Sequence, residues 1–126
     1  MQAHTFDCFS EDLGFAKHDF AKHAFTLLLT LHKPEMDCSI IEELRAIGTG
    51  FPVQVTWARS GAKSALAASP VLLKAEGADI GPFAYGAIVN ATSGRAVACF
   101  DTGEHTLKAG ESLEIRFPSI ILSVGG

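Results

Sequence analysis

Five histidines are the side chains of this sequence best suited to bind a metal ion, and they stand at positions 4, 18, 23, 32 and 105. Two histidines aim at one ion when they lie two residues apart on a strand or four apart on a helix. No pair of histidines in the sequence has either spacing. The pattern therefore predicts neither a structural nor a catalytic metal site, and it indicates no cofactor.

A hydrolytic site would need a nucleophile, a base and an acid that orients the base. No Gly-x-Ser-x-Gly elbow is present to expose a serine at a strand-to-helix turn. Cys99 is a conceivable nucleophile, but it falls within a strand that we predict to be buried. Glu11 and Asp12, like Glu42 and Glu43, are adjacent and so point in different directions on a helix. No glycine-rich loop has a phosphate-binding pattern, and we predict no enzymatic activity.

The three cysteines are Cys8, Cys38 and Cys99, and they lie far apart in the chain. An odd number without Cys-x-x-Cys spacing does not predict a disulfide framework. We interpret them as small apolar residues of a protein in a reducing cytosol. The alternative is a disulfide between subunits, because Cys8 and Cys38 lie in segments that could be exposed.

Length and charge narrow the classes of function. A chain of 126 residues has the size of one domain, and its 48% hydrophobic residues suffice for a core. Its net charge is -4, and no run of lysines or arginines forms a basic stripe, so we expect no binding of nucleic acid or of an anionic membrane. The N-terminus lacks the basic region of a signal peptide, and the apolar stretch from Phe25 to Leu31 is too short to span a bilayer. We expect a protein that is made in the cytoplasm and stays soluble.

Twelve glycines and five prolines divide the chain into short segments, which favours strands over long helices. The segments with strand patterns are 24–32, 53–57, 71–75, 83–89, 95–101, 105–107, 113–117 and 120–124. Strands at this spacing predict an antiparallel β-sandwich, similar to a jelly roll, over residues 1–126. Alternation places inward the side chains of Leu113, Ile115 and Phe117. It places on one face the side chains of Phe83, Tyr85, Ala87 and Val89.

Two short helices are predicted near the N-terminus. Ser10 can cap the first helix, within an N-terminal helical or arm segment that spans residues 1–22. A capping box from Ser39 to Glu42 predicts a second helix from Ile40 to about Ile47, which the glycines of residues 48–50 would end. Four side chains at helical spacing would form one apolar face of the first helix: Phe6, Phe9, Leu13 and Ala16.

Several segments resemble a family of small structural proteins from the particles of tailed bacteriophages. In the C-terminal half these are, in order, GPFAY at 81–85, IVNAT at 88–92, FDTG at 100–103 and LKAGESLEIRF at 107–117. The N-terminal half fits through FSEDL at 9–13, the strand and proline at 27–34, and the segment at 43–51. Each segment alone is common, but their order and spacing together cover nearly the whole chain.

The resemblance implies a virion structural protein with a β-sandwich fold and no catalytic residues. We interpret it as a capsid decoration (cement) protein, a homo-oligomer and most simply a trimer, that binds the major capsid protein on the surface of the assembled head. The acidic charge suits an outward-facing surface. The alternative is a tail-associated fibre or tip module that binds glycans on the host surface.

Five apolar side chains are candidate partner contacts, because apolar surface left outside a core tends to mark a contact site. Four of them, Phe15, Phe20, Ile40 and Ile41, lie in the segments outside the strand pattern, and Phe51 lies in a predicted loop.

We expect that deletion of residues 1–22 weakens attachment or oligomerisation and leaves the sandwich folded. The loops around Phe51 and residues 60–68 are the alternative attachment surface. Trp57, Tyr85 and the phenylalanines could form a sugar-binding platform, although a core of this size needs most of them.

Overall fold

The computed structural model describes residues 3–6, 9, 18–33, 47–60 and 63–123, and in this part the chain is mainly β. Its strands, in chain order, are β1 (Ala3–Thr5), β2 (Phe25–Thr30), β3 (Ile47–Val53), β4 (Val55–Ser60), β5 (Lys63–Ala68), β6 (Val71–Lys74), β7 (Ile80–Asn90), β8 (Arg95–Leu107), β9 (Ser112–Ile115) and β10 (Ile120–Ser123). Within these ranges, no helix is long and apolar enough to cross a membrane.

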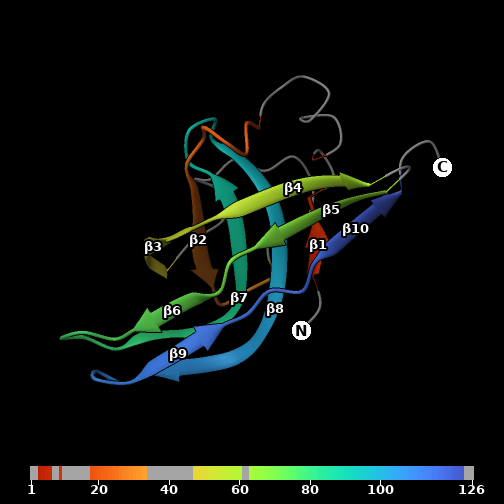
Figure 1. Cartoon of the computed structure of the whole chain (residues 1–126). Coiled ribbons are helices and arrows are strands. Elements are labelled where there is room, and N and C mark those ends of the chain that lie inside the picture. The colour runs from red at the N-terminus through yellow and green to blue at the C-terminus, as the bar shows by residue number, and fades with distance from the viewer. Residues whose placement is uncertain (1–2, 7–8, 10–17, 34–46, 61–62, 124–126) are drawn as a thin grey trace.

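The strands form three antiparallel sheets. The largest has the order β1-β8-β7-β2-β3, the second has the order β10-β5-β4, and the third pairs β6 with β9. Figure 1 shows the long strand β8 curving from the turn that follows β7 toward the pair β6–β9, which lies at the other end of the molecule. The hairpin β7–β8 therefore connects the two ends of the molecule, and it is called the central hairpin below.

The main core takes apolar side chains from all three sheets. Leu27 of β2, Leu66 of β5 and Leu73 of β6 are buried in it together. A second, smaller cluster lies on the other face of the largest sheet, since Leu28 belongs to it while its neighbours Leu27 and Leu29 belong to the main core. The strand β2 is therefore apolar on both faces, which explains its nearly continuous run of leucines.

The turn between β7 and β8 is fixed by one side chain. Asn90 accepts hydrogen bonds at Oδ1 from the backbone N–H groups of Thr92 and Ser93, both at 3.0 Å. Its own carbonyl accepts from the N–H of Gly94, whose φ of +76° suits a residue without Cβ. The segments 83–89 and 95–101, predicted as separate strands, are therefore joined by a tight turn.

The predicted single face of β7 is wrong for one residue. Tyr85, Ala87 and Val89 share the smaller cluster, but Phe83 is buried in the main core with Ile88. The pairing of β7 with β8 shifts register between Phe83 and Tyr85. An irregularity of this kind interrupts the two-residue alternation, so the side chains on its two sides no longer follow one face.

The helix predicted from Ile40 to about Ile47 does not end in a glycine cap, because Ile47 opens the strand β3. Gly50 lies beside β2, where an added Cβ would collide with the side chain of Thr26 and stand 2.9 Å from that of Leu28. The glycine therefore allows two strands to approach. Residues 40–46, and the helix predicted after Ser10, lie outside the described residues.

Two further predictions about local structure are wrong. Phe6 and Phe9 were expected on one helical face, but Phe6 is buried in the smaller cluster and Phe9 in the main core. The strand predicted over residues 53–57 is interrupted at Gln54 and divided between β3 and β4, which belong to different sheets. In the C-terminal hairpin the predicted alternation is confirmed, since Ile115 is buried and Glu114 is exposed.

Candidate functional site

Three of the five predicted contact residues, Phe15, Ile40 and Ile41, lie outside the described residues. Phe20 and Phe51 are partly buried and pack against the main core. Neither ring projects freely from the surface, because other residues of this chain cover part of each ring. Phe51 lies on β3 opposite Leu27 of β2, and Phe20 lies in the turn before β2.

Phe20 belongs to an aromatic cluster at one end of the largest sheet. We define this cluster as Phe9, His18, Phe20, Phe25 and Trp57. Phe20 stacks on Phe25 at 5.3 Å and on Trp57 at 6.1 Å, measured between ring centroids. Phe9 meets Trp57 edge to face at 5.5 Å. These contacts come from segments far apart in the sequence, so the cluster ties the N-terminal segment to β2 and β4.

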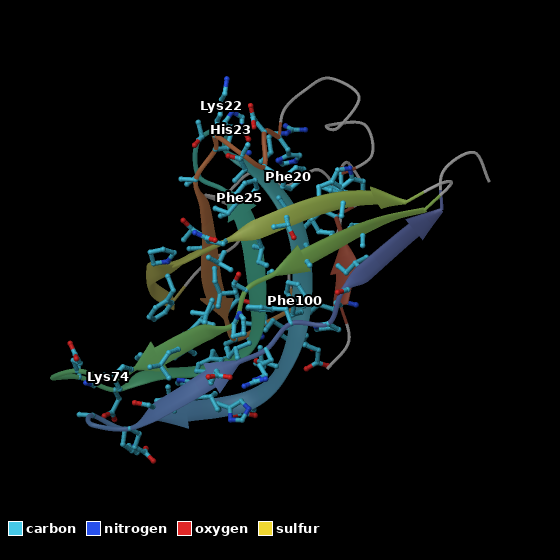
Figure 2. All side chains as sticks on the ribbon, viewed as in Figure 1. Phe20, Lys22, His23, Phe25, Lys74 and Phe100 are labelled. Atoms are coloured by element: carbon cyan, nitrogen blue, oxygen red, sulfur yellow. The ribbon has the colours of Figure 1, made fainter. Side chains whose placement is uncertain are left out.

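Asn90 and two histidines adjoin this cluster. The amide nitrogen of Asn90 lies 3.2 Å from Nδ1 of His18 and 2.8 Å from Nδ1 of His23. Asn90 is fully buried, and His18 is buried between the rings of Phe9 and Phe25. Figure 2 shows His23 with Lys22 at the end of the molecule that also carries Phe20 and Phe25.

Sequence reasoning missed this arrangement because His18 and His23 are five residues apart, a spacing that matches neither a strand nor a helix. The repeated Lys-His pairs at 17–18 and 22–23 were the available signal. Within the described part of the chain, no three His, Cys, Asp or Glu side chains are grouped so that they could hold a metal ion.

At the opposite end, the pair β6–β9 presents an outer face with one prominent apolar side chain. Val71 and Leu73 point into the core, whereas Leu72 is 60% exposed and stands opposite Glu114. Figure 2 places Lys74 at this end, far from the aromatic cluster. We call the outer face of β6 and β9 the distal face.

Ion pairs and capping carboxylates organise the surroundings of the distal face. Arg116 pairs with Glu114 at 2.5 Å, and Lys74 pairs with Glu76 at 3.3 Å. Asp79 accepts the backbone N–H of Ala109 at 2.8 Å, which joins two turns at this end. Residues 71–83 and 101–116 carry six carboxylates against three lysines and arginines, a formal charge of -3 out of -4 for the chain. Acidic side chains therefore outnumber basic ones in these two segments.

Cys99 lies on β8 and is buried, as predicted. Burial raises its pKa from 9.0 to about 11, while Lys33 lowers and Asp101 raises it by smaller amounts. The thiolate is the nucleophilic form of cysteine, so this thiol is protonated and unreactive at neutral pH. Cys8 and Cys38 lie outside the described residues.

No protein-family model matches this chain. Comparison with curated proteins and with solved structures also found no match.

Proposed function

We propose that this chain is a structural protein of a tailed-bacteriophage particle and that it decorates the capsid. The proposal is supported by the order and spacing of the segments that resemble small virion proteins, and by a mainly antiparallel β fold of the expected size. In this proposal the three sheets act as a β-sandwich that presents contact surfaces to the major capsid protein.

The exposure of the Leu72 side chain is the observation that carries the proposal. A side chain that is 60% exposed at the centre of the distal face leaves apolar area in water, and covering it would stabilise a complex. Charged side chains of both signs surround it, which resembles the arrangement of an apolar centre and a polar rim at protein interfaces. We therefore place the capsid contact on the distal face.

The proposed mechanism is linkage between binding and assembly. A protein that binds the assembled lattice, and not the separated subunits, stabilises the lattice by mass action. If the chain forms a trimer, three distal faces would engage the lattice together, and the later contacts would form at high effective concentration. The homo-oligomer and its trimeric state are parts of this proposal.

A pair of leucine substitutions tests where the contact lies. Leu72→Lys should reduce binding to capsids that lack the protein by about tenfold or more, because it places a flexible cation where the apolar centre would be buried. Leu31→Lys is the matched control, since Leu31 is also an exposed leucine but follows β2. Co-sedimentation with such capsids measures both. Equal binding by Leu72→Lys and the unmodified protein would remove the distal face from the proposal.

A tail-associated module that binds host glycans is the second candidate. It is favoured by the partly buried stack of Phe20 on Trp57, because sugars bind to the faces of aromatic rings. Antibody labelling of particles by electron microscopy separates the two candidates, since it shows the protein either over the head or at the tail.

A further inference from the structure

His23 accepts two hydrogen bonds at one ring nitrogen. The backbone N–H of Asp19 lies 3.1 Å from Nδ1, and the amide nitrogen of Asn90 lies 2.8 Å from the same atom. A backbone N–H can only donate, so Nδ1 of His23 carries no proton. The ring is therefore neutral in this arrangement, with its proton on Nε2.

The orientation of the Asn90 amide is fixed independently. Its oxygen accepts from the backbone N–H groups of Thr92 and Ser93, so its NH₂ group must face the imidazoles. One N–H of this group donates to His23 and the other lies 3.2 Å from Nδ1 of His18. The same argument makes Nδ1 of His18 an acceptor, so one buried amide holds two neutral imidazoles.

These bonds join residues 18–23 to the hairpin β7–β8. The turn over residues 19–23 is closed by the bond from the His23 N–H to the Asp19 carbonyl at 2.8 Å. Asn90 ends β7 on the other side. Next to this junction, the His18 ring packs against Phe9 and Phe20 of the aromatic cluster.

We infer that His23, His18 and Asn90 form an acid-sensitive latch that holds residues 18–23 on the sheet. An imidazolium carries protons on both nitrogens. A charged His23 would therefore point its Nδ1–H at the backbone N–H of Asp19 and the amide group of Asn90, and these donors cannot accept a hydrogen bond from it. The charged ring must leave this position. Protonation of His18 would add a second cation at the same amide.

Charged groups of both signs lie around the latch. Among the described residues, they are Asp19 and Lys22 on the turn and Arg95 on β8, which pairs with Asn90 across the hairpin. Asp19 Oδ1 accepts the backbone N–H groups of Ala21 and Lys22 at 3.0 Å, so the carboxylate caps the turn.

The sign of the pH dependence follows from proton binding. Because the closed form does not accommodate an imidazolium at His23, it loses stability as the pH falls. The inference goes beyond the proposed function and does not rest on it, because the latch is a property of the isolated protein.

Trp57 reports the state of the latch, since it is the only tryptophan and lies in the aromatic cluster. In the full-length protein, its emission maximum should move to longer wavelength, and its quenching by acrylamide should rise, between about pH 7.5 and about pH 5. Far-UV circular dichroism should change little over the same range, because the sheets stay folded.

Three variants separate the latch from general acid unfolding. His23→Asn places a side-chain oxygen near the position of Nδ1, so it keeps the acceptor without titrating, and the transition should disappear or shrink at least twofold. Asn90→Asp replaces the donor by a carboxylate that binds an imidazolium, so the direction should reverse and the cluster should tighten as the pH falls. His32→Asn changes an exposed histidine and should behave like the unmodified protein.

Two results would overturn the latch. One is a constant emission maximum and constant quenching of the unmodified protein across this pH range. The other is a transition of His23→Asn equal in size and midpoint to that of the unmodified protein. If Asn90→Asp does not fold, the comparison of His23→Asn with His32→Asn still tests the latch. Both of these variants should fold, because neither histidine side chain is fully buried.

Discussion

The ring of Phe117 packs against the ring of Phe100, with 4.6 Å between the ring centroids and 58° between the ring planes. Phe100 is buried in the middle of β8, and Phe117 follows β9 and is partly buried. The contact therefore fixes the chain between β9 and β10 against the central hairpin. A tilted aromatic pair of this kind adds stability beyond the area that it buries.

Phe117→Ala should lower the free energy of unfolding by about 2 kcal/mol, less than a fully buried phenylalanine because part of the ring is already in water. Phe100→Ala should cost roughly 3–5 kcal/mol. Urea denaturation of both variants measures the difference. An unchanged midpoint for Phe117→Ala would show that the ring does not pack on β8 in solution.

Deletion of residues 1–22 should unfold the protein or destabilise it severely. The structure revises our expectation from the sequence, because this segment contains β1, which pairs with β8, and the buried rings of Phe6 and Phe9. Loss of two buried phenylalanines costs as much as the whole stability of many domains. Near-UV circular dichroism and urea denaturation are the measurements. A cooperative transition at the midpoint of the full chain would contradict this assignment, and Lys22→Ala provides an exposed control.

Gly81→Ala should cost about 3 kcal/mol, and Gly110→Ala only about 1 kcal/mol. Both glycines have positive φ, +113° and +94°, so both substitutions strain the backbone. At Gly81 the new Cβ would also stand 2.8 Å from the carbonyl oxygen of His105, whereas at Gly110 it would meet nothing within 4 Å. Equal losses in urea denaturation would show that the close approach at Gly81 is absent.

Stability should decline as the pH rises from 9 to 11, in part because of Cys99. The unfolded thiol loses its proton near 9.0, whereas burial holds the folded thiol protonated to about 11. Above pH 9 the unfolded state therefore binds fewer protons, and the contribution of this group falls by at most about 2 kcal/mol. Cys99→Ala should show a shallower decline, with Cys8 and Cys38 replaced by serine in both proteins. Equal slopes would mean that Cys99 does not titrate differently in the two states.

The strands could be predicted where local sequence decides the structure. The apolar run of β2 and the turn residues from Asn90 to Gly94 after β7 could be predicted, because burial on two faces and side-chain capping leave local patterns. The interruption at Gln54 between β3 and β4 could not be predicted, since the residues on both sides alternate between apolar and polar in the same way. The shift between Phe83 and Tyr85 is also hidden, because an irregularity depends on the partner strand as much as on the bulged strand.

The aromatic cluster and the latch could not be predicted, because they depend on contacts between distant segments. His18 and His23 meet Asn90 across at least 67 residues of sequence. No periodicity relates such positions, and only the topology of the sheet brings them together. Phe20 illustrates the same point, since its place outside the strand pattern suggested a partner contact while the structure stacks it on Phe25 and Trp57.

The number of copies of this protein in purified particles tests the central proposal most directly. Particles produced from the genome that encodes the chain can be purified on a density gradient, and the chain can be counted by quantitative mass spectrometry against the major capsid protein. A decoration protein should be present at a fixed, near-stoichiometric ratio to the capsid subunits, because it binds a repeated lattice site. Absence from the particles, or a few copies in each, would contradict the proposal that the protein decorates the capsid.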